Sequence, residues 1–243
     1  MITSNALAEK NSRFYDALWS KTYLTRPERF NTWALVSGLL PSATQRLEVG
    51  PGLRPRLPIA DTHFIDVSRP VIERLNQRGA FALLGEITAL PFRDGMFDLV
   101  AAFDVIEHVE NDHAVLRELT RMLKPTGRLI FSVPLHPQRW TVFDDYVGHA
   151  RRYEPAALMQ LLQDFGLIVE KSGVFGMQSN NPRLLEFAVM GLTRHHSMAV
   201  RMYNWLFLPL GMLFQKRLKI SDGLIALNDV DEVILVCHPK EPV

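Results

Sequence analysis

The sequence has 243 residues, 47% hydrophobic and 22% charged, which is typical of a folded globular protein and unlike a disordered one. Its formal net charge of +1 at pH 7 gives no overall field that would attract nucleic acid, so we expect no nucleic acid partner. The single cysteine, Cys237, excludes an internal disulfide and a multi-cysteine zinc site, and the first residues lack a secretory signal pattern. These features favour a cytoplasmic protein.

Residues 1–40 carry apolar side chains at helical spacing and predict an amino-terminal helical cap, whose second helix begins at Pro27 and stops at Pro41. From residue 46, short apolar runs alternate with helical stretches, as in parallel strands buried on both faces. The apolar runs cover residues 47–49, 64–67, 81–84, 99–103, 129–133, 167–169 and 233–237. We predict one α/β domain over residues 1–243, built on a Rossmann-like, seven-stranded, mostly parallel sheet flanked by helices.

Residues 181–219 interrupt this alternation with a long, apolar and mostly helical insertion before the last strand. Its most hydrophobic part, residues 203–214, has 12 residues, whereas a membrane span needs about 20. The insertion can form core or a lid over an acceptor, a face of a homodimer, or an apolar patch for peripheral membrane contact. The sequence leaves these roles open.

A strand that runs directly into a glycine turn, Leu47–Gly52, carries the strongest chemical signal. Glycine lets the backbone approach a ligand closely, and open α/β sheets bind nucleotide-like ligands at the carboxyl end of the first parallel strand. The second strand ends at Asp66, whose carboxylate can accept hydrogen bonds from both hydroxyls of a ribose. The alternative is an acid that only caps the helix after Ser68.

Further motifs follow in a fixed order: GEITALPF at Gly85–Phe92, FDLV at Phe97–Val100, DVIEHV at Asp104–Val109 and LKPTGRL at Leu123–Leu129. Together with the glycine turn and Asp66, they resemble the class I S-adenosylmethionine (SAM)-dependent methyltransferases, of the bacterial small-molecule, Methyltransferase-11-like type. The resemblance covers residues 45–175, the predicted SAM-binding core. It implies SAM as cofactor, methyl transfer to an unidentified small-molecule or lipid-like acceptor, and a last strand, Val233–Cys237, inserted antiparallel beside the sixth.

At matching positions, the resemblance implies that Gly50, Pro51 and Gly52 face the amino-acid part of SAM, with Glu48 helping to set the turn. The chain departs from the family where a third glycine is common, because Arg54 stands there and two prolines follow. The first crossover is therefore expected to be a loop or a single turn. Arg54 either pairs with the SAM carboxylate, which its planar guanidinium suits, or lies in solvent.

The resemblance gives the rest of the cofactor site to residues at the ends of later strands. Asp66 would hold the ribose and Val67 would pack on the adenine. Glu86 would accept from the adenine amino group, and Ile87 would offer its backbone N–H to the ring. Phe103 would lie beside the methionine part.

The segment GHARRY follows the fifth strand, where this fold receives its acceptor. His149 can take a proton from an acceptor hydroxyl or amine and is the candidate catalytic residue. Arg151 and Arg152, with Tyr153 beside them, can bind a carboxylate or phosphate of the acceptor. The alternative is that the two arginines pair with Asp144–Asp145 and hold the loop.

Other assignments stay open or are disfavoured. His108 and His136 are alternatives to His149, and His195–His196 has no metal-ligand spacing, so no metal is expected. A nicotinamide-dependent oxidoreductase would use the same sheet, but its third glycine position is Pro55 here. A non-catalytic SAM-binding interaction module fits the cofactor motifs equally well. The acceptor, the choice among O-, N- and C-methylation, and the oligomeric state do not follow from the sequence.

Overall fold

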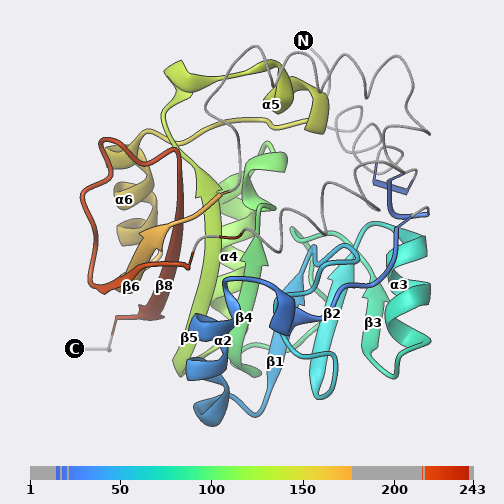
Figure 1. Cartoon of the computed structure of the whole chain (residues 1–243). Coiled ribbons are helices and arrows are strands. Elements are labelled where there is room, and N and C mark those ends of the chain that lie inside the picture. Colours follow the sequence, from blue (N-terminus) through green and yellow to red (C-terminus); the bar gives the residue numbers. More distant parts are fainter. Residues whose placement is uncertain (1–14, 17, 21, 177–214, 216, 241–243) are drawn as a thin grey trace.

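The computed structural model of the chain describes residues 15–16, 18–20, 22–176, 215 and 217–240. Its centre is an eight-stranded sheet in the order β3-β2-β1-β4-β5-β8-β6-β7 (Figure 1). The strands are β1 (Arg46–Val49), β2 (Thr62–Asp66), β3 (Phe81–Leu84), β4 (Phe97–Phe103), β5 (Leu123–Pro134), β6 (Leu167–Val174), β7 (Ile220–Asp222) and β8 (Glu232–Pro239). The helices described are α2 (Trp33–Leu39), α3 (Arg69–Asn76), α4 (Asp112–Met122), α5 (Val142–Val147) and α6 (Pro155–Asp164), with 3-10 turns η1 (Pro27–Arg29), η2 (Leu40–Ser42), η3 (Ile106–His108) and η4 (Pro137–Arg139).

The pairing of the strands confirms the predicted Rossmann-like fold. Strands β3, β2, β1, β4 and β5 run parallel to one another. Strand β8 lies antiparallel between β5 and β6, so the last strand has the predicted place and direction. All seven predicted strands are present, and the eighth, β7, was not predicted because its three residues, two of them exposed, form no apolar run.

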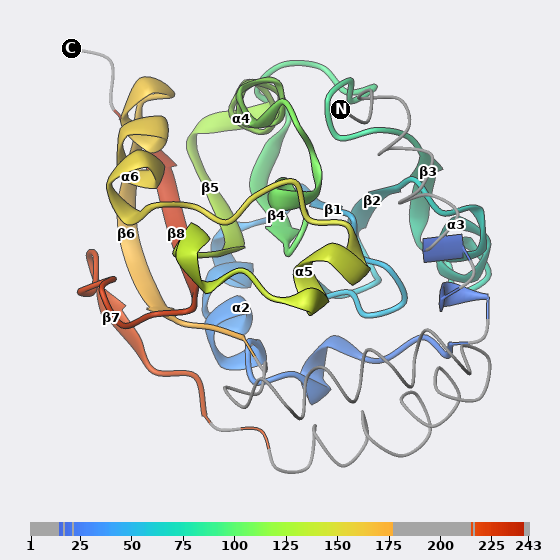
Figure 2. The same cartoon turned by 90° about the horizontal axis from the view of Figure 1, so that it is seen from above.

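Helices cover both faces of the sheet, as the view from above shows (Figure 2). Alternate residues of β4 point to opposite faces, so Val100 belongs to the same buried cluster as Leu119 of α4, while Leu99 belongs to the cluster that contains Val36 of α2. Helix α6 joins α4 on the first face. The runs of the parallel strands are apolar on both sides because each side is covered.

The described part of the predicted amino-terminal cap differs from one long helix over Pro27 to Leu40. The 3-10 turn η1 ends at Arg29 and is followed by Phe30, whose backbone is extended with φ of −93° and ψ of 147°. This break lets the Phe30 ring become buried, 3.7 Å below the guanidinium of Arg56. Helix α2 begins only at Trp33 and passes into η2, which contains Pro41.

The first crossover, residues 50–61, contains no helix, as the two prolines after Arg54 predicted. Leu53 and Leu57 of this loop are fully buried, so the loop fills the space that a helix would otherwise cover. Residues 1–14 of the predicted cap lie outside the described residues, as does all of the predicted insertion at 181–219 except residues 215 and 217–219. Among the helices described, none is long and apolar enough to cross a bilayer.

Candidate functional site

The glycine turn after β1 has a backbone that only glycine adopts easily. Gly50 and Gly52 have φ of +64° and +54°, in the left-handed region. A Cβ atom on Gly50 would lie 2.5 Å from Cγ2 of Val105, which is too close for any side chain. The Gly50 N–H donates to the carbonyl of Ile65 at 2.7 Å and so ties the turn to β2.

The Glu48 carboxylate holds the loop that follows the turn. It is buried in β1 and accepts hydrogen bonds from the backbone N–H groups of Arg56, at 2.9 Å, and Leu57, at 2.8 Å. Burial raises the pKa of Glu48 to about 7, although the two backbone hydrogen bonds oppose the rise. Glu48 therefore fixes the path of the loop.

Asp66, at the end of β2, joins the glycine turn to the start of α3. Its Oδ2 accepts from the Gly52 N–H at 3.0 Å and its Oδ1 from the Ser68 N–H at 2.8 Å. Burial raises the pKa of Asp66 to about 6 against the effect of these hydrogen bonds. A carboxylate has about four acceptor positions, so the local bonds leave acceptor capacity for a further donor.

The described amino-terminal residues lie over the glycine turn, which no sequence motif indicated. The Trp19 indole is so close to Gly52 that a Cβ atom there would lie 2.3 Å from its Cζ2. The Arg54 guanidinium stands 5.3 Å from the centre of the same indole. The Ser68 hydroxyl donates to Asp16 at 2.7 Å and ties this segment to α3.

The predicted adenine contacts gather at the carboxyl ends of β2 and β3, which are paired in parallel. Val67, directly after a buried strand, is 41% exposed. Glu86 is exposed and Ile87 is buried. Phe103 lies further along the same edge of the sheet, at the end of β4, with its ring centre 6.2 Å from that of Phe175.

Charged groups from several strands meet beside Phe103, and the sequence did not predict this. Asp104 has a φ of +54°, and the Ser132 hydroxyl donates to its carboxylate at 2.5 Å. Burial and the charge of Asp104 raise the pKa of Glu232 well above its usual value. Within the described part of the chain, Nη1 of Arg56 and Oε1 of Glu232 are buried without a hydrogen-bond partner.

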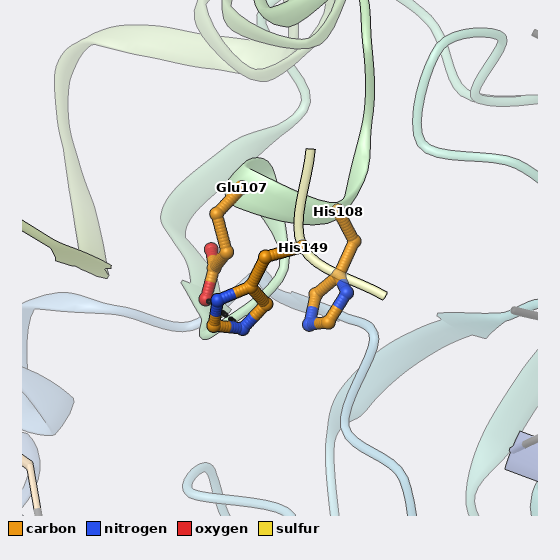
Figure 3. A group of neighbouring side chains, drawn as sticks. All are labelled: Glu107, His108 and His149. Carbon is orange, nitrogen blue, oxygen red and sulfur yellow. Dashed lines mark ion pairs between the residues drawn. The ribbon is translucent and has the colours of Figure 1, made fainter. Parts of the chain in front are cut away.

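His149 stands opposite η3, beside Glu107 and His108 (Figure 3). Its Nδ1 lies 2.8 Å from Oδ1 of Asp144, and its Nε2 lies 3.9 Å from Oε1 of Glu107. The two imidazole rings are 4.7 Å apart and nearly perpendicular. His108 places Nδ1 at 3.2 Å from the Gly148 carbonyl, which fixes the orientation of its ring.

Three ionisable groups in and around this cluster have shifted pKa values. Burial raises the pKa of Asp144, but hydrogen bonds from His149, Arg152 and Thr141 outweigh it and hold that pKa well below its usual value. Burial and the charge of Asp104 raise the pKa of Glu107 well above its usual value. Burial, helped by His149, lowers the pKa of His108 to about 3, so this imidazole is neutral at physiological pH.

The sequence from β1 to β5 is similar to a known family. Residues 47–131, from β1 to β5, match a family model described as a methyltransferase domain. This part of the chain is therefore similar to a methyltransferase domain. The glycine turn, Asp66, Glu86 and the Glu107–His108 pair all lie inside the matched range.

Two curated relatives match parts of the chain. The uncharacterized protein YafE of Escherichia coli is 32% identical over 116 residues, 44% of this chain and 56% of that protein. A demethylmenaquinone methyltransferase of Mycolicibacterium vanbaalenii is 39% identical over 69 residues, 27% of this chain and 30% of that enzyme. Both matches span less than two thirds of the relative's own length.

A solved structure gives a likeness over the whole chain. A SAM-dependent methyltransferase of Thermotoga maritima aligns over 98% of this chain and 98% of its own, with a TM-score of 0.60 and 18% sequence identity. At this identity the likeness concerns the fold, and it extends beyond the residues matched by the family model.

The three predicted acceptor-binding residues outside that matched range all bind other residues of the chain. Arg152 is buried and makes a two-pronged pair with Asp144, both bonds at 2.8 Å. Arg151 pairs with Asp112, and the Tyr153 hydroxyl donates to the same carboxylate at 3.1 Å. This geometry supports the alternative in which the arginines hold the loop, with Asp112 in place of Asp145 as the partner of Arg151.

Proposed function

We propose that this chain binds SAM at the carboxyl edge of β1 to β4 and transfers its methyl group to a small-molecule acceptor. The observation that carries the proposal is the bond between the Gly52 N–H and the Asp66 carboxylate. It joins a bare backbone turn, which a ligand can approach closely, to an acid with acceptor capacity left for ribose hydroxyls. The family match of residues 47–131 supports the same activity.

Within this proposal, the amino-acid end of SAM meets the turn formed by Gly50, Pro51 and Gly52. Arg54 pairs with the SAM carboxylate, and Trp19, which now lies on Gly52, turns to face the ligand. The Arg54 guanidinium already lies over the Trp19 indole next to the turn, which supports this arrangement.

Asp66 binds the ribose, and the adenine lies on the exposed face of Val67. The Glu86 carboxylate and the Ile87 N–H bind the edge of the adenine ring, and Phe103 borders the methionine part. Exposed Val67 beside exposed Glu86 supports this choice, since an adenine presents one apolar face and one polar edge.

For the transfer step we propose His149 as the group that accepts the proton of the acceptor. Its Nδ1 donates to Asp144, which leaves the lone pair of Nε2 for a proton. Methyl transfer itself mainly requires the sulfonium methyl and the attacking atom to be in line. The base then matters for acceptors whose hydroxyl or amine holds its proton tightly.

We propose only that the acceptor is a small molecule and do not name its class. The demethylmenaquinone methyltransferase match covers 27% of this chain, too little to carry an acceptor across. A cytoplasmic location belongs to the same proposal and is supported by the one thiol, Cys237, which is free and buried.

The experiment supplies the purified chain with SAM labelled on its methyl group, together with fractionated small-molecule and lipid extracts. Label in a fraction that stays unlabelled with His149→Ala supports both transfer and the role of His149. Binding of SAM with no label in any fraction would point to the non-catalytic module instead. Binding of NAD in preference to SAM would point to the oxidoreductase.

A further inference from the structure

Three side chains of metal-binding type meet beyond the carboxyl end of β4. Glu107 and His108 come from η3, after β4, and His149 comes from the loop after α5 (Figure 3). One ligand atom from each lies within 4.8 Å of the others. Within the described part of the chain this is the one such group of three.

Each imidazole of the cluster has its other nitrogen held by a neighbour. Nδ1 of His149 lies 2.8 Å from the Asp144 carboxylate, and Nδ1 of His108 lies 3.2 Å from the Gly148 carbonyl. Both partners are acceptors, so each Nδ1 carries the hydrogen and each Nε2 carries the lone pair. Metal-binding histidines are oriented by this kind of partner, in which a carboxylate or a carbonyl fixes the tautomer.

The Glu107 carboxylate supplies a second, independent observation. The residue is 1% exposed, and its Oε2 is buried without a hydrogen-bond partner among the described residues. A buried carboxylate oxygen with no donor is costly, and it also lies among other acids. A cation bound to this carboxylate through Oε1, the oxygen that faces His149, would compensate its charge.

We propose that Glu107, His108 and His149 bind one divalent transition-metal cation of the zinc type. Two imidazoles and one carboxylate suit such a cation better than magnesium or calcium, which prefer oxygen ligands only. The 3.9 Å between Oε1 of Glu107 and Nε2 of His149 is close to the roughly 3.3 Å expected between two ligands of a tetrahedral zinc ion. Three protein ligands leave a fourth position open, as in catalytic sites.

One contact has to change when the cation binds. The Tyr15 hydroxyl now lies 3.1 Å from Nε2 of His108 and uses its lone pair. The hydroxyl must turn aside, while the bonds to Asp144 and Gly148 can stay as they are. The rearrangement therefore involves one side chain of the amino-terminal segment.

The cation also defines a chemical preference of the acceptor, and this consequence rests on the proposed function. Its open position takes a hydroxyl oxygen and lowers the pKa of that hydroxyl. With the cation bound, the lone pair of His149 is a metal ligand and the cation activates the acceptor; without the cation, His149 accepts the proton as proposed above. The oxygen attacks the methyl carbon, the S–CH3 bond breaks as the O–CH3 bond forms, and the hydroxyl proton leaves to solvent.

The test titrates the chelator-treated full chain with Zn²⁺ by calorimetry and with Co²⁺ by visible absorption. We expect one equivalent of either cation and a tetrahedral Co²⁺ spectrum. Glu107→Gln and His149→Ala should weaken binding at least tenfold. His113→Ala, which removes a histidine whose side chain is 62% exposed, should bind like the unchanged chain.

Wild-type affinity in both Glu107→Gln and His149→Ala, or no stoichiometric binding by the unchanged chain, would overturn the proposal. Glu107→Gln keeps the size of the side chain, so it remains informative if a histidine variant does not fold. SAM binding is measured on the same samples. If the unchanged chain binds SAM but neither Zn²⁺ nor Co²⁺, the cation site is refuted and the proposed function stays intact.

Discussion

Replacing Gly50 by alanine tests whether the turn needs glycine for both its backbone angle and its close contact. The φ of +64° costs an alanine about 1–2 kcal/mol. The new Cβ would also lie 2.5 Å from Cγ2 of the Val105 side chain, and overpacking of this kind typically costs about 1–3 kcal/mol. We therefore expect Gly50→Ala to lower the free energy of unfolding by about 2–5 kcal/mol.

Gly79→Ala is the matched control. Gly79 has a φ of +80°, also left-handed, but a Cβ atom there meets nothing within 4 Å. It should show only the backbone cost, so Gly50→Ala should lose about 1–3 kcal/mol more than Gly79→Ala. Urea unfolding followed by circular dichroism measures both, and in a chain of this size each kcal/mol corresponds to about 2–4 °C in Tm.

The comparison has a clear refuting outcome. Equal losses in the two variants would mean that Val105 moves aside without cost and that the turn is not closely packed. A Gly50→Ala variant as stable as the unchanged chain would contradict the left-handed backbone itself.

Three further predictions concern single side chains. The folded pKa of Glu48, about 7, exceeds its usual value, so its protonation contributes stability that is present below pH 4.5 and is lost as the pH rises through 7. The free energy of unfolding of Glu48→Gln, measured with urea at pH 5 and pH 8, should therefore rise relative to that of the unchanged chain between the two pH values. The relative gain at pH 8 should be at most on the order of 3 kcal/mol. Arg152→Ala leaves the buried Asp144 without its two-pronged partner and should cost about 3–5 kcal/mol in the same assay, whereas a loss under 1 kcal/mol would contradict the pairing. SAM binding should change the fluorescence of Trp19, and a titration of Trp19→Phe should lack that change; an equal change in the variant would assign it to another tryptophan.

Much of the fold followed from the sequence because local patterns decide it. The apolar runs predicted seven strands, since a parallel strand covered on both faces must be apolar throughout. The prolines after Gly52 predicted a crossover without a helix, because proline removes a helical hydrogen bond. Strand β7 was missed, since three residues carry no periodicity, and so was the break at Phe30, which depends on a guanidinium far along the chain.

The sequence predicted which side chains lie at the ends of neighbouring parallel strands, but it did not predict contacts between loops that are distant in the chain. Asp66 and the glycine turn could be placed at one edge because the parallel order of the strands dictates it. The approach of His149 to Glu107 joins residues that lie 42 positions apart, through η3 and α5. The position of Trp19 over Gly52 likewise depends on how the amino-terminal segment packs, for which the sequence has no motif.

The central claim is that Asp66 and the glycine turn together bind SAM. Calorimetric titration of SAM into the full chain tests it, with Asp66→Asn compared with Asp61→Asn, whose side chain is 86% exposed. Loss of a charged hydrogen-bond acceptor for the ribose should weaken binding by about 10- to 100-fold in Asp66→Asn, while Asp61→Asn binds like the unchanged chain. Equal SAM affinity in all three proteins, or no binding by the unchanged chain, would contradict the claim.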